Sequence, residues 1–361
     1  MRRTLGLSVS LSTLLPLVLS GALAAYAPAE AKVHHGSLSW QISNVGADQE
    51  LRGLAPVSRH TAWVSGDSGG VWRTTDGGAT WEDVSPPDST EDTLYRDVEA
   101  TDADHALLLA IGVGEDSKIL RTSDGGATWE TTFVNDDPNA FYDCMAMWPG
   151  GRDGIAMSDP PDGKFRIIRT HDSGRTWSVV PNAGMPPAGT AEFGFAASGT
   201  CLVTAGHRDA FLASGGSDSR IYRSHDQGTT WTAVESPIPP VKDAGGTFGL
   251  AFRNPRQGFA VGGDFTAPDN GAKASAFTRD GGRTWTSGGD LGGYRSGVAW
   301  VSGARRTAIA VGTSGSDVTY DGGRTWAAFG TDQGGFDSVQ CVPGGTCWAA
   351  GADGRVGLLR R

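Results

Sequence analysis

The sequence predicts an all-β fold, a seven-bladed β-propeller of four-stranded antiparallel blades. Three observations lead to this prediction. Glycine supplies 54 of the 361 residues, beside 18 prolines, a composition typical of short strands joined by tight turns. An eight-residue motif recurs six times along the chain, at intervals that suit one four-stranded blade per copy. No segment shows a sustained helical period in its apolar residues.

The repeated motif, which we call the octet, first occurs as TTDGGATW at residues 74–81. Every copy has Ser or Thr first, Asp third, Gly fifth and Thr-Trp at the end, and successive octet aspartates lie 48, 48, 54, 54 and 41 residues apart. The residues before each octet read as three strands and those after it as a fourth. The octet aspartates and tryptophans are Asp76 and Trp81, Asp124 and Trp129, Asp172 and Trp177, Asp226 and Trp231, Asp280 and Trp285, and Asp321 and Trp326.

The octets are predicted to be structural turns. An Asp side chain accepts N–H bonds within its own turn, Gly adopts positive φ, and Thr bonds back to the backbone. The Trp ring then packs under the outer strand. A single binding site does not need six copies on separate blades, and the octet lacks the ligand ladder of a calcium loop.

Six octets nevertheless predict seven blades. After Trp326, residues 336–342, 346–352 and 354–360 supply three further strands without a fourth. Residues 37–45 (SLSWQISNV) supply the missing strand, because Trp40 precedes Trp81 by 41 residues, the same step that separates Trp285 from Trp326. We therefore expect the N-terminal strand to close the ring as the outer strand of the last blade, which leaves no free seam.

The N-terminus is predicted to be a signal peptide. Residues 1–31 combine a basic start, an apolar stretch and an Ala-Glu-Ala site, the pattern of a cleaved secretory signal. Residues 32–361 then form a single propeller domain. We expect a protein exported to the periplasm or the medium.

Charge and cysteine content narrow the function. The formal net charge of -10 and the absence of Lys/Arg runs disfavour nucleic acid and anionic membranes as partners.

Export permits disulfides. Cys341 and Cys347 flank a turn and are expected to pair, whereas the pairing of Cys144 with Cys201 is left open. No Cys-x-x-Cys or other ligand pattern predicts a metal, and no motif predicts a cofactor.

The octet resembles the Asp-box, or BNR, repeat of sialidases, xyloglucanases and sortilin-type receptors. Together with the SWQISNV opening and the seven units, it is most similar to the photosystem II stability/assembly factor family and its secreted bacterial relatives. The resemblance covers nearly all of residues 32–361. It implies a basic patch that holds a partner, although this chain is acidic.

Candidate ligand contacts lie where each inner strand begins and in the loops between second and third strands, because propellers bind ligands at the mouth of the central channel. Aromatic rings, arginines and carboxylates recur at these positions and suit a polar ligand. Each also has a structural alternative, as a bond between blades or a turn cap. The candidates are Tyr95, Arg96, Tyr142, Asp143, Glu192, Asp264, Tyr294, Arg295 and Asp337.

The sequence leaves two functions open. The first is a non-enzymatic module that binds a protein or peptide, as an assembly factor does. The alternative is a glycoside hydrolase, which needs two carboxylates about 5–9.5 Å apart. Its candidates are Asp143, Asp159, Asp162 and Glu192 on the third and fourth blades. The partner is therefore an unidentified protein, peptide or glycan, and we expect the protein to be a monomer.

Overall fold

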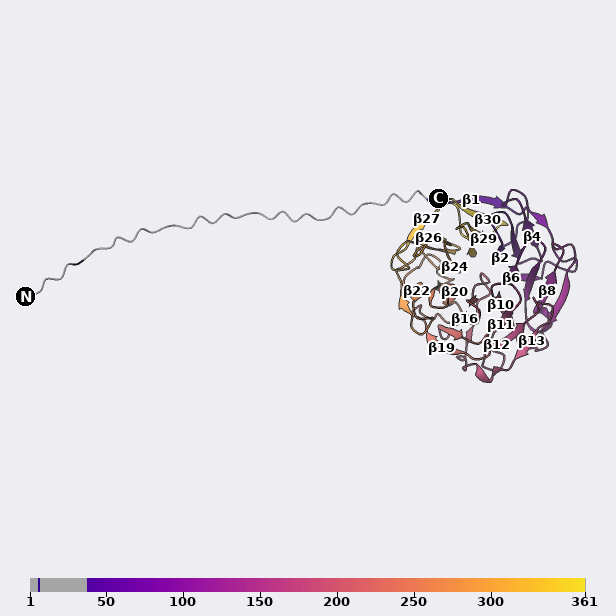
Figure 1. Ribbon diagram of the computed structural model, residues 1–361, viewed down its shortest axis with the longest axis horizontal. Helices are drawn as coiled ribbons and strands as arrows, with labels where there is room; N and C mark the ends of the chain where they lie inside the picture. Colours follow the sequence, from indigo (N-terminus) through magenta and orange to yellow (C-terminus); the bar gives the residue numbers. More distant parts are fainter. Residues whose placement is uncertain (1–5, 7–37, 361) are drawn as a thin grey trace, which may run out of the picture. The chain divides into compact units, whose positions relative to one another are not determined.

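Seven antiparallel sheets form a closed ring, shown in Figure 1. The computed structural model describes Gly6 and residues 38–360, and residues 38–360 belong to one compact unit. The prediction of a seven-bladed, all-β propeller is confirmed. Apart from Gly6, the predicted signal peptide lies outside the described residues.

Blades one to three follow the predicted order from inner to outer strand. Blade one contains β2 (Leu51–Pro56), β3 (Ala62–Gly66), β4 (Val71–Thr74) and β5 (Glu82–Asp83). Blade two contains β6 (Leu94–Ala100), β7 (Ala106–Ile111), β8 (Lys118–Thr122) and β9 (Glu130–Val134), with the 3-10 turn η1 (Gly114–Asp116) before β8. Blade three contains β10 (Tyr142–Met147), β11 (Gly154–Ser158), β12 (Arg166–Thr170) and β13 (Ser178–Val180), followed by η2 (Asn182–Gly184).

Blades four to seven keep this order, with one addition. Blade four contains β15 (Leu202–Ala205), β16 (Asp209–Ala213), β18 (Arg220–Ser224) and β19 (Thr232–Glu235). Blade five contains β20 (Gly245–Asn254), β21 (Gln257–Asp264), β22 (Ser275–Thr278) and β23 (Thr286–Ser287), and two short strands extend it, β14 (Glu192–Phe193) and β17 (Gly215–Gly216). Blade six contains β24 (Gly297–Trp300), β25 (Ala308–Gly312), β26 (Gly315–Thr319) and β27 (Ala327–Phe329). Blade seven contains β28 (Ser338–Cys341), β29 (Cys347–Gly351), β30 (Arg355–Arg360) and β1 (Ser39–Asn44).

The N-terminal strand closes the ring. β1 pairs antiparallel with β30, and Trp40 lies opposite Leu359; in Figure 1 the indigo β1 lies beside the yellow β30. The buried Trp40 ring packs 5.2 Å from the ring of Phe336, and its Nε1 donates to Ser316 Oγ at 3.0 Å. The indole therefore joins blade seven to blade six.

Each of the six octets folds into the same kind of turn. In the fourth copy, Asp226 Oδ1 accepts bonds from Thr230 N at 2.8 Å and from the Ser224 hydroxyl at 2.8 Å, and Asp226 Oδ2 accepts from the Thr230 hydroxyl at 2.6 Å. The equivalent bonds recur in the other five copies. These contacts satisfy the aspartate within its own turn, as a structural role requires.

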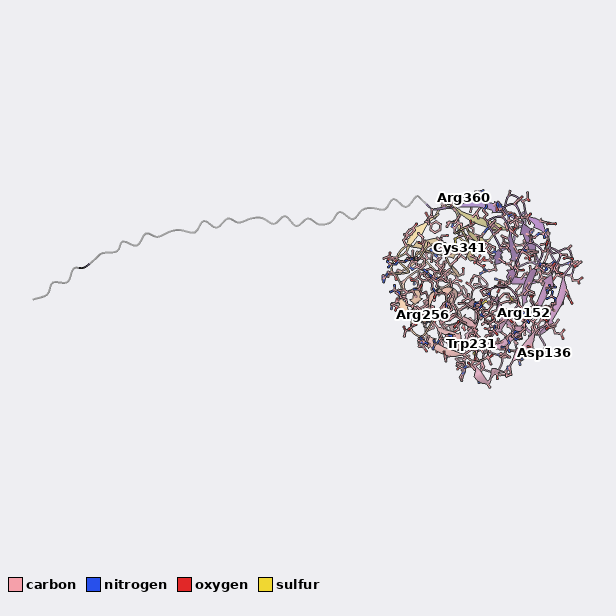
Figure 2. All side chains as sticks on the ribbon, viewed as in Figure 1. Asp136, Arg152, Trp231, Arg256, Cys341 and Arg360 are labelled. Carbon is pink, nitrogen blue, oxygen red and sulfur yellow. A yellow bond between two sulfur atoms is a disulfide. The ribbon has the colours of Figure 1, made fainter. Side chains whose placement is uncertain are left out.

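Apolar side chains from neighbouring blades share each core. Trp63 of blade one, for example, packs edge-on against Trp129 of blade two, with ring centroids 6.3 Å apart. Figure 2 shows side chains filling the spaces between the blades. Two disulfides add covalent links, Cys144 to Cys201 and Cys341 to Cys347.

The blade topology gives the ring two distinct ends. Strands alternate in direction, so every inner strand begins at the same end, which we call the mouth. The octets and the hairpins between first and second strands lie at the opposite end, the octet face; Gly77 N, for example, donates to His60 O of such a hairpin at 2.8 Å.

Candidate functional site

A segment of blade four closes the central channel. Between β14 and β15, residues 194–200 do not continue the sheet. Apart from Phe195 they carry small side chains, Ala196, Ala197, Ser198 and Gly199 among them, which suit a narrow space. We call residues 194–200 the plug.

Contacts of the plug with blades one to three place it across the channel. Gly194 N donates to Asp159 Oδ1 of blade three at 2.7 Å, and Ala197 O accepts from Arg52 Nη1 of blade one at 3.4 Å. Gly199 lies so close to blade two that a Cβ there would be 2.4 Å from Asp97 Oδ1. A segment of blade four reaches all three blades only by crossing the axis of the ring.

The plug is equally fixed to blades five and six. Thr200 O accepts from Leu250 N at 3.0 Å, and the Ser198 hydroxyl donates to Ser296 O at 2.9 Å. The next residue, Cys201, is tied to Cys144 of blade three by a disulfide. The plug is therefore an integral part of the ring.

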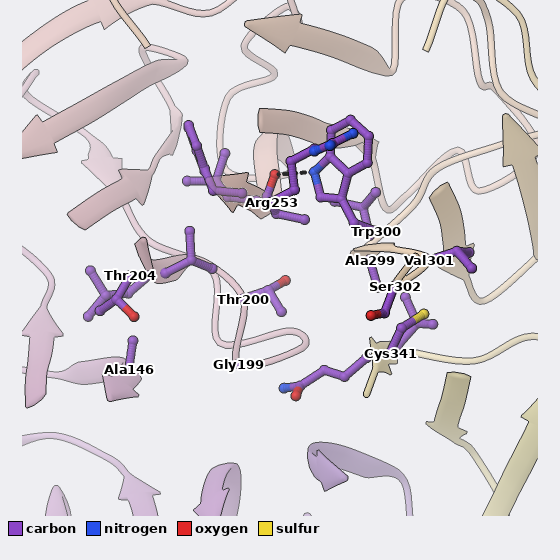
Figure 3. A pocket seen from close by; sticks show the side chains of 18 of the residues that line it. Ala146, Gly199, Thr200, Thr204, Arg253, Ala299, Trp300, Val301, Ser302 and Cys341 are labelled. Carbon is purple, nitrogen blue, oxygen red and sulfur yellow. Dashed lines mark hydrogen bonds between the residues drawn. The ribbon is translucent and has the colours of Figure 1, made fainter. Parts of the chain in front are cut away.

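Below the plug, the channel widens into a cavity of about 690 Å³. Its walls come from the ends of the inner strands of blades two to seven, and the plug residues Gly199 and Thr200 line it as well. Figure 3 shows these two residues on a loop among the lining side chains. Since the lining also includes Ser302 and Arg305 of a first hairpin, the cavity lies toward the octet face.

Two carboxyl groups of blade two, the buried Asp97 and the half-buried Glu99, hold the edge of blade three. Asp97 Oδ2 accepts from Met145 N at 2.7 Å, and Glu99 accepts from Met147 N. Burial raises the pKa of Glu99 to about 8, and burial together with the nearby Glu99 raises the pKa of Asp97 well above its usual range. Burial therefore favours the protonated form of both groups.

Asp143 and Asp159 form a second carboxyl pair against the plug. Burial, followed by the charge of Asp159, raises the pKa of Asp143 well above its usual range. Burial also raises the pKa of Asp159 to about 6, against the opposing hydrogen bonds from Gly194 N–H and from Asp143. The two groups thus share a proton, with Asp143 as the donor to Asp159.

An arginine cluster lies at the mouth beside the plug. Arg52 forms ion pairs with Glu50 at 2.6 Å and with Asp337 at 3.1 Å. Burial raises the pKa of Asp337 to about 7, although Arg52 acts to lower it. The neighbouring Arg96 is half-buried, and burial and the charge of Arg52 lower its pKa. Within residues 38–360, the Arg96 guanidinium has neither a hydrogen bond nor an ion pair, and its Nε is buried without a partner.

Arg295, by contrast, is structural. Its side chain is 2% exposed and pairs with the equally buried Asp317 at 2.6 Å. Its Nη1 also donates to Tyr294 O and to Ser314 Oγ. The prediction that Arg295 contacts a ligand does not fit this burial.

The predicted tyrosines are also packed inside. Tyr95 bonds to Ser89 Oγ at 2.8 Å, while Tyr142 accepts from Arg166 Nε of its own blade at 3.3 Å and packs edge-on against Phe133 of blade two. Burial raises the pKa of Tyr142 to about 12, against the opposing bond from Arg166. Tyr294 is buried in the channel beneath the mouth, and burial raises its pKa.

Glu192 requires a correction. It does not begin an inner strand: β15 is the inner strand of blade four, and Glu192 belongs to β14 ahead of it. Its carboxylate accepts bonds from Arg220 Nε at 3.1 Å, Tyr222 Oη at 3.0 Å and Gly189 N at 2.7 Å. Glu192 therefore anchors the segment that leads into the plug.

The remaining candidates lie apart from this group. Asp264 accepts from Thr266 N at 2.8 Å and caps its own turn, while Asp162 is exposed in the loop after β11. Among the carboxylates proposed for hydrolysis, the structure brings together only Asp143 and Asp159. Arg52 and the plug are not among the predicted site residues, although the longer step of 54 residues between the third and fourth octets marks the inserted chain.

Residues 38–360 lack two further features. No helix there is long and apolar enough to cross a membrane. No group of three or more His, Cys, Asp or Glu side chains is arranged to hold a metal ion in the same residues.

Comparisons with known proteins show the fold. No family model matches the chain. No curated protein matches it in sequence. A structure of YCF48 bound to D1 peptide is 17% identical, with a TM-score of 0.64 over 89% of this chain and 96% of that one. YCF48 from Cyanidioschyzon merolae is 16% identical, with a TM-score of 0.61 over 89% and 98%. The WD40 propeller domain of Doa1 is 12% identical, with a TM-score of 0.59 over 90% and 97%. At these identities the likeness shows a shared propeller architecture.

Proposed function

We propose that this protein is an exported, non-enzymatic propeller that binds a peptide segment of a partner protein at its mouth. The observation that carries the proposal is Arg96, a half-buried guanidinium without an ion pair among the described residues, beside Arg52. Asp67, Glu50 and Asp337 act on this guanidinium only through longer-range charge, and a ligand carboxylate supplies the direct, two-pronged contact that it lacks. The partly exposed Arg52 extends the same surface.

The plug supports binding on the mouth surface instead of inside the channel. Residues 194–200 fill the axis beneath Arg52, so a ligand at the mouth lies over them. A rigid, largely preformed surface binds with little reorganisation. The likeness to a YCF48 structure that holds a peptide is consistent with a ligand of this class.

Glycoside hydrolysis stays a second prediction. The proton-sharing pair Asp143 and Asp159 has the raised pKa values that acid catalysis uses. The geometry is less favourable, because Asp143 is 2% exposed and hydrogen-bonds to Asp159. Glycosidase carboxylates stand about 5–9.5 Å apart, with the sugar between them.

The test is to measure binding of the purified protein to two immobilised panels, one of short acidic peptides and one of neutral oligosaccharides. Peptide binding that falls about tenfold or more in Arg96→Gln supports the proposal, since an ion-paired hydrogen bond contributes about 1.5–3 kcal/mol. Arg208→Gln is the matched control, because it removes an equally charged, exposed side chain from a hairpin at the octet face. Release of reducing sugar from the oligosaccharides, with no peptide bound, would support hydrolysis instead.

A further inference from the structure

Five aromatic rings form a continuous cluster at the mouth. Phe195 stacks on Phe248 at 3.7 Å, and Phe193 lies edge-on to Phe195 at 5.1 Å. Tyr294 and Phe265 approach the other sides of Phe248, at 4.8 and 6.4 Å. We call these five residues the aromatic platform.

The platform is buried below and open above. Phe248 and Tyr294 are buried, and they hold the other rings in place. Phe193 and Phe195 are half-buried, while Phe265 is 47% exposed. Among residues 38–360, Phe265 is one of few large apolar side chains that are exposed at the surface. Rings fixed from beneath present a stacking surface at little entropic cost.

The arginine cluster adjoins the platform. Arg52 bonds to Ala197 O, two residues from Phe195, and its charge acts on Tyr294. Arg96 lies within electrostatic reach of Arg52. The mouth thus presents exposed rings next to two guanidinium groups, on a chain whose net charge is -10. Arg52 is already paired with Glu50 and Asp337, so Arg96 is the guanidinium left to bind a ligand carboxylate directly, while Asp67, Glu50 and Asp337 act on it only through longer-range charge.

We propose that the mouth recognises an internal, extended peptide segment in which an aromatic or large aliphatic side chain lies close to a carboxylate. This inference rests on the proposed function and specifies its ligand. The apolar side chain stacks on Phe193, Phe195 and Phe265, while the carboxylate pairs with Arg96.

The plug explains why the segment lies across the mouth. Its bonds to Asp159, Arg52 and Ser296 leave no free passage along the axis for a threaded chain. Neutral sugars also stack on aromatic rings, but they leave the charge of Arg96 without a partner. An acidic peptide satisfies both the rings and the guanidinium.

The experiment uses a positional-scanning library of blocked peptides, in which one position is Trp, Phe, Leu or Ala and a neighbouring position is Asp or Asn. Binding is measured for the natural protein, Phe265→Ala, Arg96→Gln and Val179→Ala. Val179, on the outer strand β13, is 46% exposed and is therefore a matched apolar control for Phe265. All these substitutions alter exposed or half-buried side chains, so folding is checked by circular dichroism alone.

The proposal expects Trp and Phe peptides to bind about three- to tenfold more tightly than Ala peptides, the range that aromatic contacts give. Phe265→Ala removes that preference, and Val179→Ala keeps it. Binding that depends on Arg96 but ignores the aromatic position overturns this inference and leaves the proposed function standing. Binding to no peptide, or to neutral oligosaccharides alone, overturns both.

Discussion

Gly199 lies directly against the buried carboxyl group of Asp97, at φ +71°. A Cβ at this position would be 2.4 Å from Asp97 Oδ1. Because Asp97 also accepts the Met145 N–H bond, it cannot move aside without exposing that donor. The contact between the two residues thus fixes how deeply the plug enters the channel.

Gly199→Ala is expected to lower the free energy of unfolding by about 2–4 kcal/mol, the sum of positive-φ strain and overpacking. Gly303→Ala is the control, since Gly303 has φ +82° but nothing within 4 Å of its Cβ position. Urea unfolding measures both. Equal losses in the two variants would contradict a close fit of the plug.

Arg295→Met is expected to destabilise the protein by about 3–5 kcal/mol, because it leaves Asp317 buried without its cation. Arg295→Met combined with Asp317→Leu is expected to recover much of that loss. Chemical denaturation of the single and double variants gives the coupling energy. A loss of the same size in Arg96→Gln would contradict the distinction between a structural and a binding arginine.

Asp226→Ala is expected to lower stability by about 1–3 kcal/mol, because Ser224 and Thr230 lose their acceptor. Peptide affinity is expected to stay unchanged, since the octets lie at the end opposite to the mouth. Asp104→Ala, at an exposed position in a hairpin of the octet face, is the control for loss of one surface charge. A change in affinity without a change in stability would assign the octets to binding.

Trp40→Ala is expected to cost about 3–5 kcal/mol, as for other fully buried large side chains. Trp40 fills the joint between blades six and seven through Ser316 and Phe336. Ile42→Ala on the same strand, 43% exposed, is expected to have little effect. Thermal melts give the melting temperature of each variant. Similar melting temperatures for the two would argue against closure through β1.

Stability is expected to fall as pH rises from about 4 to about 8. Burial raises the pKa of Asp159 to about 6, Asp337 to about 7 and Glu99 to about 8, so each group is more protonated in the folded than in the unfolded chain. Such groups stabilise the fold fully below their unfolded pKa, near 4, and that stabilisation is lost as pH passes the folded pKa.

The octet aspartates oppose this trend at low pH. Hydrogen bonds from Thr80 lower the pKa of Asp76 to about 2, so its stabilisation is lost as pH falls from about 4 toward 2. A maximum melting temperature near about pH 4 is therefore expected. Glu99→Gln is expected to flatten the decline at the alkaline end, and a melting temperature that rises from pH 6 to 9 would contradict these assignments.

The sequence predicted the ring because its repeat is local. Each octet satisfies its own aspartate within five residues, and Trp40 reproduces the spacing of an octet Trp. Such features need no knowledge of distant contacts. The seven blades and their closure through Trp40 and Leu359 follow from them.

The site was harder to predict because it depends on contacts between blades. The residues near Arg295 in the sequence do not indicate that it pairs with Asp317. This ion pair holds the Arg295 side chain away from the surface. The plug joins residues of six blades, and its Gly/Ala/Ser composition resembles that of any loop. Glu192 is expected where an inner strand begins, but it lies in the added strand β14, where it bonds to Arg220.

Hydrogen exchange of the protein with and without the tightest peptide of the scanning library tests the central claim most directly. The account predicts slower exchange in residues 192–200 and 263–269, around the plug and Phe265, and unchanged exchange in the octets. Protection confined to the octets, or to the cavity residues 298–305 at the opposite end, would contradict a binding site at the mouth.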